Sequence, residues 1–294
     1  MPGSTPAVAV VGSINIDLVA MVDRHALPGE TVLAADYAEV VGGKGFNQAS
    51  AVARRLPSWL VGCVGDDAFG ARAVEAARDR GVRVDQVARA GVPTGRAFIE
   101  VGPGGENSIV VAPLANHAVT SEQVVAALDR VRPAAVLAQL EIPFGVVAAV
   151  AGWCEANGAR FTLNPSPAAS LPASVAGPAD PLIVNEWEAA RLLDELRPAE
   201  RRDAADHAGA ARSLRAVARS VVVTAGSRGA AFATAEGAGH VPAERVRAVD
   251  TTGAGDEFAG ALVASLVAGE SFARAVESAG AAAAALVATP RSER

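Results

Sequence analysis

Short apolar, β-branched runs alternate along the chain with longer alanine-rich stretches. We expect strands at AVAVVG from Ala7, WLVGCVG from Trp59, AAVLAQLE from Ala134, RFTLNP from Arg160, PLIVNE from Pro181 and SVVVTAG from Ser220. We expect helices over residues 44–56, 68–80, 121–131 and 144–157. This alternation predicts an α/β protein, in which a central, mostly parallel sheet carries helices on both faces.

Two segments depart from this rhythm. The first, GETVLAADYAEVVGG, begins at Gly29; the second, GRAFIEVGPGGENSIVVAP, begins at Gly95 and has two alternating runs around the turn GPGG. The second segment predicts an antiparallel hairpin. Because both lie outside the alternation, we expect them to pair as a small sheet that covers one edge of the main body, as a lid. We expect one domain over 1–294, with the lid at about 14–42 and 93–113.

Composition narrows the class of protein. Of the 294 residues, 51% are hydrophobic and 4% aromatic, so the interior should consist of Ala, Val and Leu in closely packed helices. Intrinsic disorder is excluded by this apolar content. The formal net charge of -6 argues against a nucleic-acid partner, since such binders cluster Lys and Arg on one face.

The cysteine content and the N-terminus predict a cytoplasmic protein. Cys63 and Cys154 are too few and too isolated for a disulfide framework or a zinc site, and we expect both in the core of a protein from a reducing compartment. No basic segment precedes the first apolar run, which argues against a secretory signal. The longest apolar tracts, 260–269 and 280–288, fall short of the roughly 18 residues that a membrane span needs.

Polar residues follow several of the expected strands where the chain turns. In an open α/β sheet the ligand crevice lies outside the carboxyl ends of the strands, so such side chains converge there. Singly, each residue is more readily explained as a turn or helix cap. The register of the whole set is what indicates a site. Its members are Asn15, Asp17, Glu141, Asn164, Asn185 and Thr224.

The stretch GGKGFNQASAVARRL, from Gly42, combines a glycine pair, a cation and an amide at the start of an expected helix. Glycines let backbone N–H groups approach an oxygen-rich ligand, while Lys44 and Asn47 supply a charge and an amide. The stretch lacks the spacing of a Walker A loop. It is therefore a moderate signal for a polar ligand.

The stretch DTTGAGDEFAGALVASLVAG, from Asp250, places a small-residue turn before an apolar helix. The turn residues Gly253, Ala254 and Gly255 should present unpaired N–H groups at the helix N-terminus, which favours an anion. A carboxylate in the same turn is out of place as the partner of that anion, so Asp256 suits a proton acceptor in phosphoryl transfer. A plain helix cap is the alternative, and spacing does not decide between them.

These motifs resemble, in order and spacing, a known family. They are VVGSINIDLV, PGETV, GGKGFNQA, VGDDAFG, QLEIP, LNPSPA, VNEWEA, TAGSRGA and DTTGAGDEFAGAL, and they run from about residue 8 to 288. The family is the ribokinase group of the PfkB-type carbohydrate kinases. The resemblance implies a ribokinase-like three-layer α/β fold with a small β-sheet lid. It also implies ATP-dependent phosphorylation of a pentose, in ribokinase the 5-hydroxyl of D-ribose.

The resemblance further implies a role for each matching residue. The catalytic set is Asp256 as base, with Gly253, Ala254 and Gly255 as the anion hole. The sugar-binding set is Asn15, Asp17, Gly43, Lys44, Asn47, Glu141 and, again, Asp256. The nucleotide set is Asn185 and Glu188 near the phosphates and metal, and Thr224, Gly226, Ser227 and Gly229 along ATP. Mg²⁺ is an implied cofactor, Asp250 and Thr252 match two positions that bind a monovalent cation, usually K⁺, and the lid implies a homodimer.

Two departures from the family pattern stand out. After the helix at 272–288 the family usually continues with a loop R-x-G-A-x-x-S and a final helix, which we expect to be missing because the chain reads ALVATPRSER. K⁺ activation and adenine binding are the properties that this departure affects. Glu257 stands where a small residue or Thr is usual, and we expect it to face solvent on the first helical turn, where negative charge is favourable.

Three functions fit these observations. The first is a ribokinase, favoured by Asp17 together with GGKGFNQA. Asp17 and Glu141 only accept hydrogen bonds while Lys44 and the amides donate, a set that suits a polyol and would reject 2-deoxyribose. The second is a kinase for deoxyribose, fructose or a pyrimidine nucleoside. The third is a non-catalytic sugar-binding relative, against which the presence of Asp256 beside the glycine turn argues.

Overall fold

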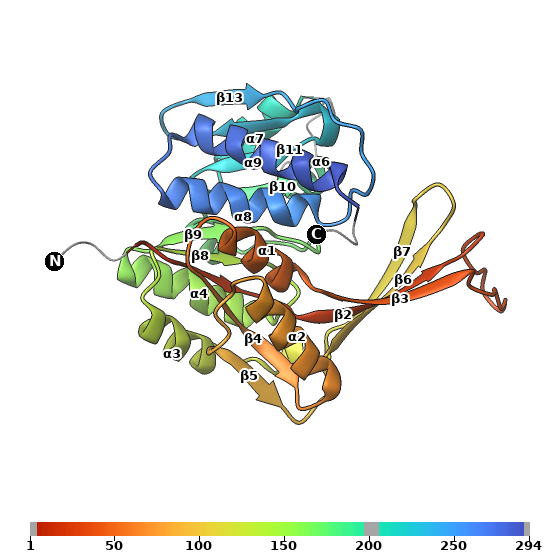
Figure 1. Cartoon of the computed structure of the whole chain (residues 1–294). Coiled ribbons are helices and arrows are strands. Elements are labelled where there is room, and N and C mark those ends of the chain that lie inside the picture. Colours follow the sequence, from red (N-terminus) through yellow and green to blue (C-terminus); the bar gives the residue numbers. More distant parts are fainter. Residues whose placement is uncertain (1–4, 197–205, 291–294) are drawn as a thin grey trace.

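The main body is built on a large sheet with helices on both faces (Figure 1). The structure is a computed structural model and describes residues 5–196 and 206–290. Within these ranges the sheet has nine strands in the order β13-β12-β11-β10-β9-β8-β1-β4-β5. The strands are β1 Val8–Val11, β4 Ser58–Gly65, β5 Val87–Ala90, β8 Ala135–Ala138, β9 Arg160–Leu163, β10 Leu182–Asn185, β11 Val221–Thr224, β12 Ala230–Ala233 and β13 Ala238–Val241. All neighbours from β5 to β11 are parallel, and β12 and β13 continue antiparallel.

Alternate residues of the central strands enter two separate cores, because successive side chains of a strand point to opposite faces. In β1, Ala9 and Val11 belong to one buried cluster, and Val8 and Val10 belong to the other. The first core is covered by α3 Ser121–Val131, α4 Phe144–Asn157, α6 Glu186–Leu196 and α7 His207–Leu214. The second is covered by α1 Lys44–Ala53, α2 Ala68–Asp79, α8 Ala254–Val267 and α9 Phe272–Ala288. Burial on both faces explains why these strands are apolar throughout.

The two irregular segments form a separate sheet. It consists of β3 Asp36–Gly42, β2 Asn15–Met21, β6 Gly95–Val101 and β7 Asn107–Ala112, in that order. β2 and β6 pair in parallel and join two antiparallel hairpins, so the predicted pairing of the two segments is confirmed. The predicted position is wrong. The sheet does not cover an edge but projects away from the body, and only its near end adjoins it (Figure 1).

All six expected strands are present, and two of the expected helices have the predicted ends, α3 and α4. The helices expected over 44–56 and 68–80 end earlier, at Ala53 and Asp79. The sequence prediction missed β5, β12 and β13. Strands such as AAFA and AGHV consist largely of Ala and Gly, which carry little strand preference, so their pattern is weak.

Both cysteines lie in the core as free thiols, as predicted. Burial raises the pKa of both thiols, that of Cys154 to about 12, so neither is a reactive thiolate near neutral pH. Across residues 5–196 and 206–290, every helix is too short or too polar to cross a membrane.

Candidate active site

The start of α1 lies against the end of β1 because glycines remove the side chains between them. A Cβ on Gly45 would lie 2.5 Å from the carbonyl carbon of Gly12, and Gly43, the residue before the helix, has a φ of 92° that favours glycine. The Phe46 N–H donates to the carbonyl of Ser13 over 3.0 Å. This contact brings the next residue, Asn47, to the carboxyl edge of the sheet.

Helix α8 packs closely on α1 and carries Asp256 to the same edge. A Cβ on Gly260 would lie 2.5 Å from the Cβ of Ala51, so the glycine permits the close contact of the two helices. Asp256 is 8% exposed. Its Oδ2 accepts a hydrogen bond from Asn47 Nδ2 over 3.0 Å, and its Oδ1 accepts one from Gln48 Nε2 over 2.9 Å. Two amides of α1 therefore hold the carboxylate.

The turn that precedes Asp256 lies at the surface. Gly253 adopts a φ of 80° as the N-cap of α8, Gly255 is exposed, and Ala254 is half-buried. We expected all three N–H groups of this turn to be unpaired, and for Ala254 this is wrong, because its N–H donates to Thr251 O over 3.2 Å. The N–H groups of Gly253 and Gly255 have no acceptor within the described ranges. Two donors thus remain available to an anion.

A hollow connects this turn with α1 and the small sheet. Its lining includes Val40 of β3, Asn47 of α1, Thr252 and Gly253 of the turn, and Asp256. The carboxylate of Asp256 therefore borders a space that a substrate can enter. Of the residues predicted for the site, the lining of this hollow includes Asn47, Thr252, Gly253 and Asp256, and it includes none of the six polar strand-end residues.

Several residues predicted to bind a sugar lie where the small sheet meets the body. Asn15 and Asp17 lie on β2, and both are buried. Gly42 of β3 faces Asp17, and a Cβ there would lie 2.4 Å from the Asp17 Oδ2, so only glycine leaves room for that carboxylate. Glu141 Oε2 accepts the backbone N–H of Lys44 over 3.2 Å and the hydroxyl of Ser13.

The residues predicted for the phosphate region lie at the ends of β10 and β11. The exposed Asn185 and the buried Glu188 form a reciprocal pair at the start of α6: Asn185 N–H donates to Glu188 Oε2 over 2.9 Å, and Glu188 N–H donates to Asn185 Oδ1 over 2.8 Å. This is a capping box, which satisfies two donors of the helix start. The pair therefore has a structural role irrespective of any ligand.

The predicted nucleotide loop follows β11 as a tight turn. Gly226 and Gly229 have positive φ values of 53° and 91°, and Ala225 N–H donates to Gly229 O over 2.8 Å. A Cβ on Gly229 would lie 2.0 Å from Val241 O, so this position needs glycine. Ser227 is exposed, while the hydroxyl of Thr224 donates to Val184 O over 3.4 Å.

Asp250 and Thr252, the predicted cation residues, lie in one turn just before α8. The Thr252 N–H donates to Asp250 Oδ1 over 2.8 Å. The N–H of Asp250 and that of Val249 point to the carbonyl of Val287 near the end of α9. The turn is therefore held against α9 by backbone contacts.

Glu257 contradicts the prediction that it faces solvent. Its side chain is 4% exposed and forms ion pairs with Arg54 and with Arg55, the latter over 3.1 Å. The prediction considered only the local helix dipole, and the two arginines come from the far end of α1. Glu257 thus joins α1 to α8, and together with Arg54 it borders the same hollow as Asp256.

The sequence prediction gave no role to four polar residues beside the candidate site: Ser13, Gln48, Asn116 and Gln139. Asn116 is buried, its Oδ1 accepts the Ile14 N–H over 2.8 Å, and its Nδ2 donates to Asn15 Oδ1 over 2.7 Å. Gln139 directly follows the apolar strand β8 and is buried, which was a usable signal because a buried amide needs a partner. Asn116 had no such signal, because it lies in an irregular connection.

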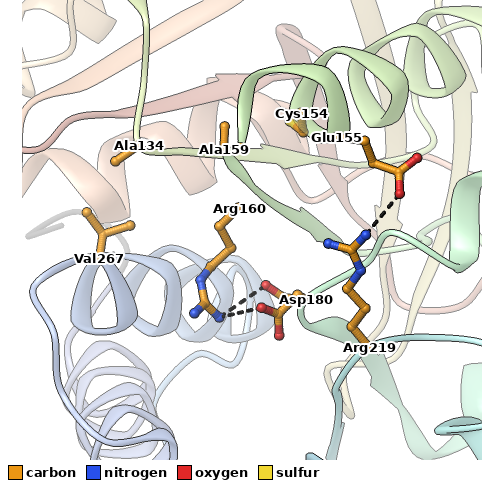
Figure 2. Close-up of a pocket in the computed structure, with 9 residues that line it drawn as sticks. Ala134, Cys154, Glu155, Ala159, Arg160, Asp180, Arg219 and Val267 are labelled. Carbon is orange, nitrogen blue, oxygen red and sulfur yellow. Dashed lines mark hydrogen bonds and ion pairs between the residues drawn. The ribbon is translucent and has the colours of Figure 1, made fainter.

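A larger hollow lies at the opposite edge of the sheet (Figure 2). Arg160 begins β9 there and pairs with Asp180 over 3.0 Å, and Arg219 pairs with Glu155 over 2.9 Å. Its arginines are thus each matched by a carboxylate, and the hollow is lined from the amino ends of the strands. The Asp256 hollow is therefore the stronger candidate site, because there an acceptor lies beside two N–H groups that have no partner in the described part of the chain.

The profile of the pfkB family carbohydrate kinase matches residues 5–293 of this chain. The chain belongs to the pfkB family of carbohydrate kinases. The resemblance drawn from the motifs is confirmed, and this pfkB kinase is an enzyme that phosphorylates a carbohydrate.

Known relatives indicate the subgroup. A ribokinase of Staphylococcus aureus is 35% identical over 266 residues, covering 89% of this chain and 86% of the relative. A deoxyribokinase of Salmonella typhimurium is 34% identical over 267 residues, covering 86% and 83%. The structure of Arabidopsis thaliana ribokinase complexed with ribose and ATP superposes on this chain with a TM-score of 0.86 at 30% identity, and the match covers 97% of this chain and 94% of that one. The predicted three-layer fold is confirmed by this likeness.

Proposed function

We propose that this pfkB kinase transfers the γ-phosphate of ATP to the 5-hydroxyl of D-ribose. The observation that carries the proposal is the position of Asp256: its carboxylate borders the hollow, beside the N–H groups of Gly253 and Gly255, which have no acceptor among residues 5–196 and 206–290. An acceptor for a proton next to donors for an anion is the arrangement that phosphoryl transfer requires. The ribokinase relatives support ribose and ATP as the substrates.

In the proposed complex, the sugar lies between the body and the small sheet. Asp17 and Glu141 accept hydrogen bonds from sugar hydroxyls, while Lys44, Asn15 and Asn47 donate, and Gly43 lets the ring approach the backbone. Such charge-assisted hydrogen bonds contribute roughly 1.5 to 3 kcal/mol each. Their geometry would fix the 5-hydroxyl next to Asp256.

The transfer then proceeds in line. Asp256 accepts the proton of the 5-hydroxyl as its oxygen forms a bond to the γ-phosphorus. The bond from that phosphorus to the bridging oxygen breaks, and ADP leaves with the electron pair. The turn of Gly253, Ala254 and Gly255 holds the migrating group, and the Ala254 N–H has to leave Thr251 O to take part. Proximity and electrostatics supply most of the rate in such reactions.

We propose that ATP lies along the loop after β11. Gly226, Ser227 and Gly229 offer backbone approach, and Thr224 a hydroxyl, at an exposed turn. Glu188 keeps one carboxylate oxygen outside the capping box, which fits Mg²⁺, since this ion is commonly bound by one or two carboxylates together with substrate phosphates. Bound Mg²⁺ would neutralise phosphate charge, and Asn185 would hold the helix end towards it.

We propose that Asp250 and Thr252 serve a monovalent cation. Their oxygen donors suit K⁺, and the cation would stabilise the turn that leads to Gly253. The test is sugar-dependent ADP release in K⁺ and in a K⁺-free buffer of equal ionic strength. Equal rates would exclude the cation role while leaving the kinase proposal intact.

We propose that the small sheet closes over the sugar and pairs with that of a second copy. On the face that carries Asp17 the next row is apolar, because Val19, Ile99 and Ile109 lie side by side there. Ile109 is 50% exposed, although it is a large apolar side chain. Burial of this row in a homodimer removes it from water.

A second substrate has a specific observation in its favour, the deoxyribokinase relative of nearly equal identity. The test of both is a coupled ADP assay with ribose, 2-deoxyribose, fructose and uridine, on the wild type and on Asp256→Asn. We expect the highest kcat/KM on ribose, and a loss of about 10²-fold or more in kcat with Asp256→Asn, because that is the usual contribution of a general base. Preference for another substrate would refute ribose, and undiminished kcat in the variant would refute the mechanism.

A further inference from the structure

Gln48, the residue after Asn47, is a fully buried amide whose hydrogen bonds all go to polar groups of the site. Its Nε2 donates to Asp256 Oδ1 over 2.9 Å and to Asn164 Oδ1 over 3.1 Å. Its Oε1 accepts from Gln139 Nε2 over 2.6 Å. The side chain is 0% exposed, so water cannot replace any of these partners.

The orientation of the Gln48 amide follows from the groups around it. Asn164 Nδ2 donates to the carbonyl of Ile183 over 3.0 Å, and a carbonyl only accepts, so Asn164 must turn its oxygen towards Gln48. Asp256, as a carboxylate, also accepts only. Both N–H groups of Gln48 are therefore required on this side, and its oxygen has to face Gln139. If the Gln48 amide were flipped, its Oε1 would face the oxygens of Asn164 and Asp256 without a hydrogen between them.

On the basis of the proposed function, we infer that Gln48 is a positioning residue for the base Asp256. It fixes Oδ1 from the buried side, so that the carboxylate keeps one orientation towards the hollow. Asn47 differs, because it is half-buried, lines the hollow and can exchange its bond to Asp256 for one to a sugar hydroxyl. Gln48 thus holds the base, and its neighbour Asn47 contacts the substrate.

The test is Gln48→Met, which keeps the length of the side chain and removes its donor. We expect kcat to fall by about 10- to 100-fold, the scale of a small misplacement of a reacting group, with the sugar KM close to wild type. The acidic limb of the kcat profile should move to higher pH, because a donor that favours the charged carboxylate is lost. A purely structural role would not move this limb.

Two further variants keep the test decisive. Ser58→Ala is the matched control: Ser58 is fully buried and donates to Ala49 O of α1 over 2.9 Å, without touching the site. It should lose comparable packing and keep the wild-type kcat and pH profile. Gln139→Met frees the far side of Gln48 and should change kcat and the pH profile in the same direction by less. It also serves where Gln48→Met does not fold.

The outcomes separate this inference from the proposed function. If Asp256→Asn is inactive while the Gln48 and Gln139 variants match wild type in kcat and pH profile, the inference alone is overturned. If Asp256→Asn is fully active, the proposed mechanism fails. A sugar-free crystal structure of Gln48→Met should show the Asp256 carboxylate displaced or in several conformers. An unmoved carboxylate overturns the inference whatever the substrate is.

Discussion

The ion pairs of Glu257 lead to an asymmetric prediction for stability. The Glu257 carboxylate is 4% exposed, whereas Arg54 and Arg55 are 47% and 29% exposed. If the glutamate is changed to Gln, the arginines can turn into solvent and regain hydration. If both arginines are changed to Ala, a buried negative charge loses both its cations. Both changes break the same ion pairs, but the first leaves solvated arginines and the second leaves an unpaired buried carboxylate.

The magnitudes follow from these exposures. Glu257→Gln removes hydrogen bonds between charged groups and keeps the volume filled, which should lower the free energy of unfolding by about 1 to 2 kcal/mol. The double variant Arg54→Ala/Arg55→Ala should lower it by about 3 to 5 kcal/mol, the cost of an uncompensated buried charge. The arginine variant should therefore be the less stable by a clear margin.

The assay is urea unfolding followed by circular dichroism, with the slope compared between variants to confirm that the same surface unfolds. Arg274→Ala is the control, because its pair with Glu277 is mostly exposed and should contribute no more than about 1 kcal/mol. If Glu257→Gln proves as destabilising as the double variant, or more so, the assignment of Glu257 as the buried partner is refuted.

Three further predictions concern the sugar, the base of the small sheet and assembly. Asp17→Ala should weaken ribose binding by about 1.5 to 3 kcal/mol, seen as a higher KM, and an unaltered KM would contradict its role. Burial pushes the pKa of Asp67 upward, but hydrogen bonds from Thr94 and Gly70 outweigh burial and lower the pKa overall. The stability that Asp67 contributes is thus present above the unfolded pKa of about 3.9 and is lost as pH falls through the lower folded pKa. Asp67→Asn should therefore make the free energy of unfolding, measured with urea, fall less steeply at acid pH. An equally steep fall in the variant would exclude this contribution of Asp67. Ile109→Lys should convert the proposed homodimer into a monomer, measured as a halved mass in light scattering. An unchanged mass would show that this face of the small sheet is not the dimer contact.

Much of the fold could be predicted from the sequence because its signals are local. The central strands are continuous apolar runs, and the hairpin around GPGG has two alternating runs, so the secondary structure of each can be predicted from its own residues. The candidate site followed from the rule that parallel strands end at one edge. By contrast, β12 and β13 have too few β-branched residues to be seen, and the direction in which the small sheet projects depends on contacts at its base. There Asn116 binds Ile14 and Asn15 across about a hundred residues of sequence.

Two features of the site that the sequence did not reveal, the Gln48 partner of Asp256 and the ion pairs of Glu257, have one physical origin, the close contact of α1 with α8. Gly260 allows this contact, since any side chain there would collide with Ala51. Through it Gln48 reaches Asp256, and the arginines at the end of α1 reach Glu257. Neighbouring carboxylates in one helical turn thus receive opposite environments, amides for Asp256 and cations for Glu257. Local sequence rules treat them alike, because only the packing of a second helix gives Asp256 two amide donors and Glu257 two cationic partners.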